Sequence, residues 1–474
     1  MQNLFKKKYR LLCKSLFMKD LLSYIVLLLV IIPFNVRAVQ NDFYGDTISS
    51  GEYHILHIRD YTFDELLDDG ITTAARQFEV LHIPIQSFRC FIKKCIKGHR
   101  FELNKGERRV KKTIFRSIAF SYPSISPQGK PIMLSGLVTV PILTDNKPFR
   151  MLIYHRLTAS TNKVAPTNNV PVEAVLTADN TICVFPDYYG CGITEGNPLP
   201  HTALNYHARC SSECALAALN VVHDLGIELA DGFYTWITGY SQGGGYALAT
   251  HKYIETSLPD SLSQLINLRW SLCGGGIYSP LKLYKTAIET GDMGDTPVVF
   301  LQGVRGLFSG HQDQMEGLYI RDLLSDEAVK LGLDSLLQTY DDGFWYLEEK
   351  LDGRFKTHST ADYFSPNVLD TSSALFRRLA TAFNLDDCAE GWKPKAPIAL
   401  YHSKRDRCIP FQLASQTQKH FYDTCSYCTI TTPFLNFSHA FTYILYLSKI
   451  LGLREDKLYK KHIQAKKFDM PCLK

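Results

Sequence analysis

The sequence lacks the short signatures that mark most cofactor-dependent and metal-dependent enzymes. It has no phosphate-binding loop, no dinucleotide-binding fingerprint and no cluster of metal-ligating side chains. Gly274-Gly275-Gly276 is a lone glycine run without the spacing of either nucleotide motif. We therefore expect neither a cofactor nor a metal ion.

The chain also has little sequence that could span a membrane. Its main apolar run, Leu21 to Phe34, has fourteen residues, whereas a membrane-spanning helix needs about 20. A lysine-rich stretch precedes this run and Val36-Arg37-Ala38 follows it, which is the order found in a signal peptide. We predict cleavage after Ala38 and a secreted or periplasmic mature chain. The alternative is an uncleaved N-terminal membrane anchor.

An excess of charge of one sign is absent once this leader is removed. The chain has 52 Lys and Arg against 47 Asp and Glu, and residues 1–38 hold seven of the former and one of the latter, which leaves 45 against 46. This balance removes the electrostatic basis for a nucleic-acid partner.

Cysteine is present in moderate number. Twelve of the thirteen cysteines follow the predicted cleavage site, and an even number is compatible with disulfides in an oxidising compartment. Cys425 and Cys428 have the spacing of half a zinc or redox site, but no second pair follows them. Structural cysteines or one local bridge are therefore favoured for this pair.

From about residue 110, short β-branched and aromatic runs alternate with helical stretches, which is typical of an α/β sheet covered by helices on both faces. The strand and helix order over residues 181–272 predicts a mostly parallel sheet with right-handed crossovers. After Pro280 the pattern is helical, with helices around 281–290, 313–338, 341–350 and 372–384. The predicted parts are a signal peptide (1–38), an N-terminal extension (39–110), a first core part (111–280), a helical cap (281–390) and a second core part (391–474).

Gly239-Tyr240-Ser241-Gln242-Gly243 matches the G-x-S-x-G pattern. The strand-like run Tyr234 to Thr238 precedes it and a helical pattern over 242–255 follows it. A strand-to-helix turn this sharp crowds its neighbours, so glycines two positions before and after the serine avoid clashes. The pattern predicts Ser241 as a nucleophile exposed at the end of the strand.

A serine hydroxyl needs a positioned base to take its proton. In the strand-turn-helix arrangement of this motif, an acid and then a histidine follow the serine in loops after late strands. Asp406 follows the predicted strand Pro397 to His402, and His439 follows Tyr427 to Thr432 and begins the last helix. We predict that His439 is the general base and that Asp406 orients it.

Acyl transfer also needs donors for the developing oxyanion, and two backbone N–H groups are the usual solution. The N–H of Gln242 begins the helix after Ser241 and gains from the helix dipole. The second donor is expected in the loop after the strand Met151 to Tyr154, at Leu157 or Thr158.

Four segments in combination resemble the secretory-lipase-like branch of bacterial and fungal α/β-hydrolases. They are Ser135-Gly136-Leu137-Val138-Thr139-Val140-Pro141, Tyr154 to Thr158, Pro186-Asp187-Tyr188-Tyr189-Gly190-Cys191-Gly192 and Gly239 to Gly244. The resemblance spans about residues 110–450 and implies the α/β-hydrolase fold, hydrolysis of carboxylic esters, and triad positions at Ser241, Asp406 and His439. The helical insertion then corresponds to a cap over Ser241.

One segment departs from this family pattern. The loop after Tyr154 usually carries His-Gly-Thr or a similar turn of small residues, and here it is His155-Arg156-Leu157-Thr158. Leu157 stands where a glycine is common in the family, so the departure affects the geometry of the oxyanion donors. The Asp187 segment is expected to be structural.

The sequence thus predicts a secreted serine hydrolase that cleaves small-molecule or lipid esters through an acyl-enzyme. Two alternatives stay open, a serine peptidase on the same fold and a binding protein that has lost the reaction. Loss of Ser241, Asp406 or His439 would indicate the second, and all three are present. The residues favour no particular oligomeric state.

Overall fold

A computed structural model describes residues 52–77, 84–97, 99, 101, 113–142, 147–158, 164–338, 347–351, 355, 357–424 and 426–464. The chain divides into two units, residues 1–39 and 40–474, and the described residues all belong to the second. The predicted signal peptide and the alternative membrane anchor therefore lie outside the described residues. Within the described ranges, no helix combines the length and the apolar character that crossing a bilayer requires.

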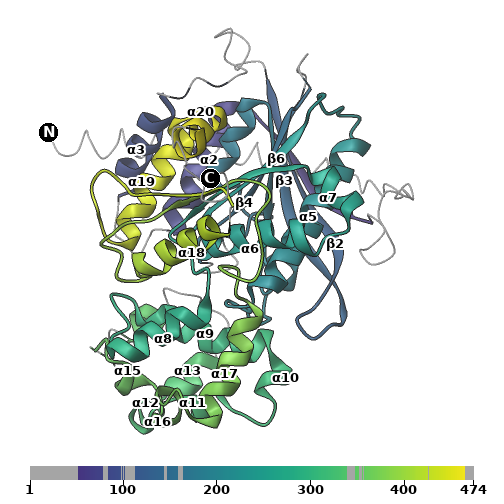
Figure 1. The fold of residues 1–474 in the computed structure, drawn as a ribbon. Helices are drawn as coiled ribbons and strands as arrows, with labels where there is room; N and C mark the ends of the chain where they lie inside the picture. The colour runs from purple at the N-terminus through teal and green to yellow at the C-terminus, as the bar shows by residue number, and fades with distance from the viewer. Residues whose placement is uncertain are drawn as a thin grey trace, which may run out of the picture. The chain divides into compact units, whose positions relative to one another are not determined.

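Nine strands of the described chain form one mixed sheet in the order β1-β2-β3-β5-β4-β6-β7-β8-β9. Figure 1 shows strands of this sheet with helices packed around them. Pairing is antiparallel from β1 through β2 and β3 to β5, and parallel from β5 through β4, β6, β7 and β8 to β9. The strands are β1 His54–Tyr61, β2 Ile114–Ile125, β3 Pro131–Ile142, β4 Arg150–His155, β5 Thr181–Pro186, β6 Tyr234–Tyr240, β7 Leu268–Gly274, β8 Ile398–Tyr401 and β9 Cys428–Thr431. The predicted α/β class with a mostly parallel sheet is confirmed.

Alternating side chains of the central strands feed two apolar cores, one on each face of the sheet. In β4, Met151 belongs to one core and Leu152 to the other, and Ile237 and Trp236 of β6 divide in the same way. The first core includes helices α5 Leu204–Asp224, α6 Gln242–Thr256, α7 Asp260–Ile266 and α18 Phe411–Asp423. The second includes α2 Phe63–Gln77, α3 Ile85–Lys97, the 3-10 helix η4 Val172–Asp179, α19 His439–Gly452, α20 Glu455–Tyr459 and the π-helix η6 Lys460–Gln464. Helices therefore cover both faces.

The range 39–110, predicted as an N-terminal extension, contributes to this layered structure where it is described. Strand β1 pairs along β2 and forms one edge of the sheet. Leu66 and Ile71 of α2 and Ile92 of α3 are fully buried in the second core. This part of the chain thus completes one face of the sheet.

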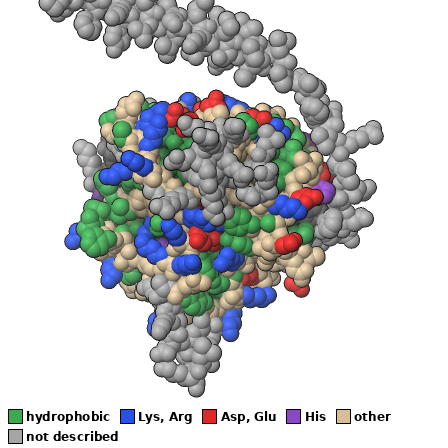
Figure 2. Space-filling model, turned by 90° about the horizontal axis from the view of Figure 1, so that it is seen from above, with side chains coloured by type: hydrophobic (Ala, Val, Ile, Leu, Met, Phe, Trp, Pro, Cys, Tyr) green, Lys and Arg blue, Asp and Glu red, His purple; other side chains and the backbone are tan. Residues whose placement is uncertain are grey.

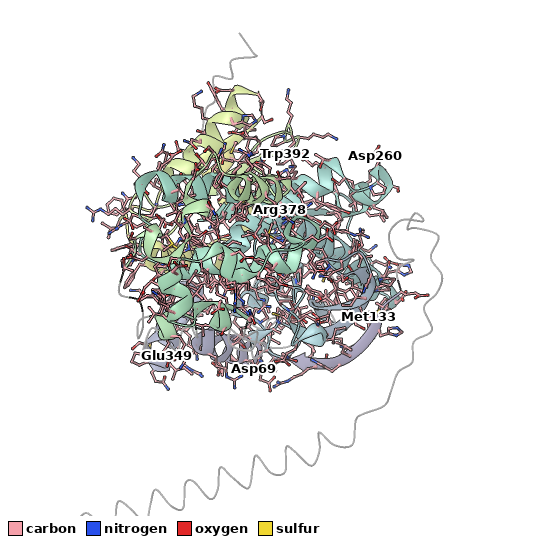
Figure 3. The ribbon with its side chains drawn as sticks, turned by 90° about the horizontal axis from the view of Figure 1, so that it is seen from below. Asp69, Met133, Asp260, Glu349, Arg378 and Trp392 are labelled. Atoms are coloured by element: carbon pink, nitrogen blue, oxygen red, sulfur yellow. The ribbon has the colours of Figure 1, made fainter. Side chains whose placement is uncertain are left out.

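The helical insertion follows β7 and has an apolar core of its own. The helices labelled in this part of the chain are α8 Pro280–Thr290, α9 Pro297–Gly310, α10 Gln312–Met315, α11 Ile320–Leu323, α12 Asp326–Lys330, α13 Leu333–Gln338, α15 Thr360–Tyr363, α16 Pro366–Leu369 and α17 Ala374–Leu385. The stretch predicted as helical over 313–338 is divided, because Gly317 and Gly332 have positive φ of 72° and 79°. Arg378 of α17, labelled in Figure 3, donates to the carbonyls of Gln314 and Glu316 and ties α17 to the turn after α10.

A buried arginine joins the N-terminal end of β4 to three other elements. Arg150 is 1% exposed, and it donates to Thr181 Oγ1 and to the Asp179 carbonyl, both at 2.8 Å. The carboxylates of Asp179 and Glu455 each lie 3.9 Å from its guanidinium. Glu455 also accepts from Trp270 Nε1 at 2.6 Å.

We expect Arg150→Ala to lower the free energy of unfolding by about 3–5 kcal/mol, because it removes the buried cation that faces the carboxylates of Asp179 and Glu455. Urea denaturation followed by circular dichroism measures the loss. Arg59→Ala is the matched control, since Arg59 pairs with Asp69 at 2.9 Å on a side chain that is 57% exposed. That change should cost less than about 1 kcal/mol. Equal losses in the two variants would contradict the assigned role of Arg150.

Candidate active site

Ser241 lies at the sharp turn between β6 and α6. Its backbone has φ 57° and ψ −122°, which is a strained conformation for a residue with a Cβ. The Ser241 N–H donates to the Gly274 carbonyl at 2.8 Å and so ties the turn to the end of β7. A Cβ at Gly239 or Gly243 would collide with backbone carbonyls, including that of His155. These contacts explain why the turn needs glycine on both sides of the serine.

The structure brings Ser241, His439 and Asp406 together in one hydrogen-bonded row. His439 Nε2 lies 2.8 Å from Ser241 Oγ, and His439 Nδ1 lies 2.6 Å from Asp406 Oδ2. The side chain of His439 is 17% exposed and that of Asp406 is fully buried. With a proton on Nδ1, Nε2 is free to accept the serine proton, which is the arrangement that activates a hydroxyl.

The Asp406 carboxylate is held by its own loop. Its Oδ1 accepts from the backbone N–H groups of Cys408 at 3.0 Å and Ile409 at 2.8 Å. The side chains of Cys408 and Ile409 are buried in the apolar core of the helical insertion. Packing of the insertion therefore helps to fix the acid.

A second histidine, His402, also faces this carboxylate. His402 Nε2 lies 3.3 Å from Asp406 Oδ2 and 2.8 Å from the Ile409 carbonyl. Burial raises the pKa of Asp406, but the charge and hydrogen bonds of His439 and His402 outweigh burial and hold that pKa well below the usual range. Stability from the ionised group is complete above the ordinary Asp pKa of about 3.9 and is lost as pH falls below it.

Two tyrosines that no sequence motif marks form hydrogen bonds with the backbone of His439 and of the Ser241 turn. Tyr240 OH donates to the His439 carbonyl at 2.8 Å, and its ring lies 5.1 Å from the imidazole. Tyr446 OH contacts the carbonyl of Gly239 at 2.9 Å. Helix α19 is thereby fixed against the turn that carries Ser241. Tyr240 occupies the variable position before the serine in G-x-S-x-G, and no periodicity points to such a role.

The residues predicted around the oxyanion position lie in two neighbouring segments. Gln242 begins α6, so its backbone N–H has no partner within the helix. Its side chain turns away and donates to Tyr246 OH at 2.6 Å. Leu157 and Thr158 are partly exposed and follow β4, whose last carbonyls lie against Gly243.

Arg156, in the segment that departs from the family pattern, is buried. Its guanidinium donates to the Asp187 carbonyl at 2.5 Å and to the Val164 carbonyl at 3.3 Å, and it lies 5.0 Å above the Tyr188 ring. The arginine thus pins the loop after β4 to the loop after β5. Burial lowers the pKa of neighbouring His155 to about 3, so that imidazole is neutral at pH 7.

The Asp187 carboxylate accepts hydrogen bonds that hold the loop after β5 in place. This carboxylate accepts from Ser135 Oγ at 2.6 Å, from Thr167 Oγ1 at 2.5 Å and from Thr167 N at 3.0 Å. All these partners are buried, which leaves the carboxylate no access to a ligand.

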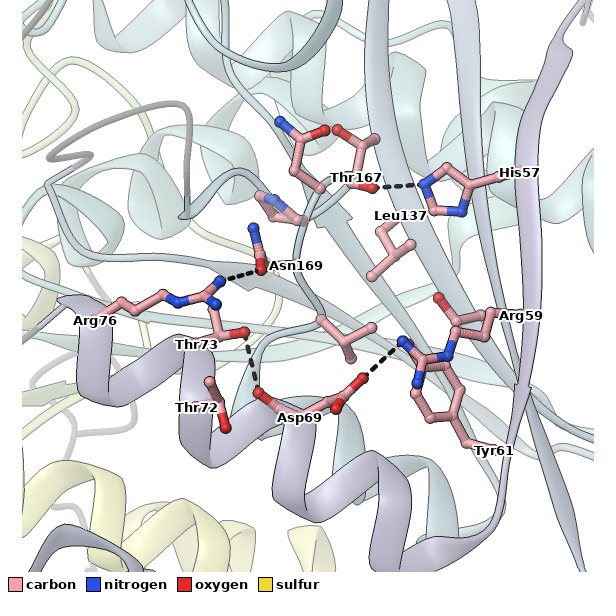
Figure 4. A pocket seen from close by; sticks show the side chains of 14 residues that line it. His57, Arg59, Tyr61, Asp69, Thr72, Thr73, Arg76, Leu137, Thr167 and Asn169 are labelled. Carbon is pink, nitrogen blue, oxygen red and sulfur yellow. Dashed lines mark hydrogen bonds and ion pairs between the residues drawn. The ribbon is translucent and has the colours of Figure 1, made fainter. Parts of the chain in front are cut away.

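A polar pocket of about 280 Å³ lies beside this loop, between β1, α2 and residues 166–170 (Figure 4). Its charged groups have partners in the pocket: Arg59 pairs with Asp69 at 2.9 Å, and Arg76 donates to the amide oxygen of Asn169 at 2.8 Å. His57 Nε2 lies 2.7 Å from the Thr167 carbonyl. Because these pocket side chains already have partners within the protein, we assign the chemistry to Ser241, His439 and Asp406 instead.

Among the described residues, no group of three or more His, Cys, Asp or Glu is placed to hold a metal ion. Ten of the thirteen cysteines are described and each has a free thiol, namely Cys90, Cys95, Cys183, Cys191, Cys210, Cys214, Cys273, Cys388, Cys408 and Cys428. Cys425 lies outside the described residues. Figure 2 shows basic and acidic side chains interspersed with apolar ones on the face seen from above.

Comparison with known proteins relates this architecture to enzymes of one fold. No protein-family model and no curated protein matches the sequence. The rice cell wall degrading esterase LipA from Xanthomonas oryzae matches in structure with a TM-score of 0.62 at 18% identity, over 87% of this chain and 99% of that one. A Legionella pneumophila protein matches with a TM-score of 0.63 at 16% identity, over 88% and 99%. Closed Candida antarctica lipase A matches with a TM-score of 0.53 at 14% identity, over 84% and 81%.

These identities are low, so the matches bear on the fold rather than on the substrate. The matches cover most of the chain and include both an esterase and a lipase. The fold expected from the resemblance is confirmed. The chain has the α/β-hydrolase fold, in the form shared with lipase and esterase structures.

Proposed function

We propose that the chain is a secreted serine hydrolase that cleaves carboxylic esters. The observation that carries the proposal is the row from Ser241 Oγ to His439 Nε2 at 2.8 Å and from His439 Nδ1 to Asp406 at 2.6 Å. Its position on an α/β-hydrolase fold supports the same assignment. Secretion rests on the leader-like residues 1–38.

In the proposed reaction, Ser241 Oγ attacks the ester carbonyl carbon while His439 Nε2 takes the hydroxyl proton. The tetrahedral intermediate collapses, the C–O bond to the alcohol breaks, and His439 returns the proton to the leaving alkoxide. Water then attacks the acyl-enzyme with His439 again as base, which releases the acid and restores Ser241. Asp406 stabilises the imidazolium formed in each half and holds the imidazole in the required tautomer.

The backbone N–H of Gln242 is the proposed first donor to the oxyanion. The second is assigned to Leu157 or Thr158, in the loop that Arg156 joins to the loop after β5. Each such donor contributes on the order of 3 kcal/mol to stabilising the transition state.

Hydrolysis of p-nitrophenyl esters from acetate to palmitate by residues 39–474 tests this proposal. We expect turnover on at least one ester and covalent labelling by a fluorophosphonate probe, because the probe reacts with an activated serine hydroxyl. Ser241→Ala is the control and should take up no label. Labelling without turnover on any ester would favour the peptidase alternative, and neither labelling nor turnover would favour a binding protein.

A further inference from the structure

The loop that leads into His439 and the first turn of α19 expose a set of large apolar side chains. Phe434 is 99% exposed, Leu435 55%, Phe437 37% and Phe441 65%. Among the described residues, Phe434, Phe437 and Phe441 are the only phenylalanines exposed to this degree. Large apolar side chains exposed together on a soluble protein mark an interaction surface. We refer to residues 434–441 as the aromatic loop.

The aromatic loop is held in place rather than left free. Ser403 Oγ donates to the Phe437 carbonyl at 2.6 Å, and the Lys404 N–H donates to Asn436 Oδ1 at 3.1 Å. The rings of Phe437 and Phe441 lie 6.0 Å apart, on either side of His439 in the chain. The loop therefore presents its apolar side chains beside the Ser241 site in a fixed arrangement.

Cationic side chains border this apolar surface. Lys404 and Arg405 are exposed and belong to the segment that is hydrogen-bonded to the aromatic loop. No ion pair joins either side chain to a carboxylate within the described ranges. Arg407, by contrast, lies 3.2 Å from Asp292 and 3.5 Å from Asp295 of the helical insertion. Asp406, which lies between Arg405 and Arg407 in the chain, is buried and hydrogen-bonded to His439. The exposed charge beside the aromatic loop is therefore positive.

We infer that the aromatic loop, with Lys404 and Arg405, docks the chain on an anionic phospholipid surface. Phenylalanine and leucine side chains enter the boundary between headgroups and acyl chains, and nearby cations bind anionic headgroups. Docking there brings the Ser241 site to the lipid. The consequence that the substrates are lipid esters in that surface rests on the proposed function, whereas docking itself does not.

Charge favours a lipid surface over a second copy of the chain. In a two-fold symmetric dimer the same patch meets itself, so Lys404 and Arg405 would approach their own equivalents. Like charges brought together across an interface oppose association. An anionic surface instead complements both the cations and the apolar side chains.

Vesicle co-sedimentation with Ser241→Ala, in the mature chain, tests docking without turnover. We expect binding to phosphatidylcholine vesicles that contain phosphatidylserine and weak binding to phosphatidylcholine alone. The double variant Phe434→Ser and Leu435→Ser should lower the partition coefficient about tenfold or more, since both side chains lose apolar burial. Lys404→Gln and Arg405→Gln should each lower it about fivefold on anionic vesicles only.

Two matched variants control for general effects of these substitutions. Leu265→Ser removes a leucine that is 37% exposed on α7, and Lys393→Gln removes an exposed lysine before β8 rather than after it. Both should leave vesicle binding unchanged. Thermal melting of each variant checks that the fold is kept, which is expected for Phe434 because it is almost fully exposed.

Other outcomes would overturn the inference. Equal binding to neutral and anionic vesicles would contradict the anionic surface, and no binding to either would exclude lipid docking. A wild-type dimer that the Phe434 and Leu435 changes dissociate would make the loop an interface between copies. Vesicle binding without ester hydrolysis by the wild type would refute the proposed function while leaving docking intact.

Discussion

Replacing Ser241 with alanine should lower kcat for ester hydrolysis by on the order of 10⁶-fold, and His439→Ala should cause a similar loss. Each change removes the proton transfer from Ser241 Oγ to His439 Nε2, which lie 2.8 Å apart. A serine without its base is a poor nucleophile, and the imidazole without the serine has no hydroxyl to activate. Steady-state rates on the best p-nitrophenyl ester measure both losses.

A variant that carries both changes shows whether Ser241 and His439 act together or contribute independently to kcat. Residues that act as one unit show non-additive losses, so Ser241→Ala combined with His439→Ala should be no slower than either single variant. His223→Ala provides the control, because His223 is 72% exposed at the end of α5. Near-wild-type turnover in His439→Ala would show that another group serves as the base.

The core of the site is predictable because its constraints are local or fixed by chain order. Gly239 and Gly243 are required by backbone contacts within one turn, and such contacts leave a five-residue pattern in the sequence. Asp406 and His439 were predicted from their places after two late strands, and the structure places both beside Ser241. Whether they act as predicted is what the variants test.

Contacts made across the fold left no comparable pattern. Arg156 lies in the segment that departs from the family pattern, yet its partner is the carbonyl of Asp187, thirty-one positions away in the chain. His402 faces Asp406 because the loop after β8 folds back toward the end of that strand. The sequence predicts where the strand ends but not that the next loop folds back. Such partners become visible only when the loops are packed together.

Strand β1 was missed for a different physical reason. It is an edge strand, and most of its side chains are exposed or partly exposed. The alternation of buried and exposed residues that predicts a strand is therefore weak there. The helices of the insertion were also predicted incompletely. Glycines divide the stretch predicted as helical over 313–338 into short helices, and these helices pack around the insertion's own core.

Asp406→Asn is expected to lower kcat by about 10⁴-fold, because the substitution alters which nitrogen of His439 carries the proton. The two N–H groups of Cys408 and Ile409 donate to Oδ1 and so fix an acceptor at that position. An asparagine must place its carbonyl oxygen there and its amide NH₂ at the Oδ2 position, 2.6 Å from His439 Nδ1. The amide then donates to Nδ1, and Nε2 keeps a proton where it must accept one from Ser241.

Asp406→Asn and Asp406→Ala differ in whether an amide can donate to His439 Nδ1, so their relative rates test the role of the tautomer. Asp406→Ala lacks the amide donor, so His439 can still adopt the productive tautomer, and we expect that variant to be at least as active as Asp406→Asn. Rates on a soluble p-nitrophenyl ester measure the order, and the thermal melting midpoint of each variant accounts for lost stability. If Asp406→Asn keeps activity within about tenfold of wild type, Asp406 is not the orienting acid. If it clearly exceeds Asp406→Ala, charge-independent hydrogen bonding rather than the tautomer explains the role of Asp406.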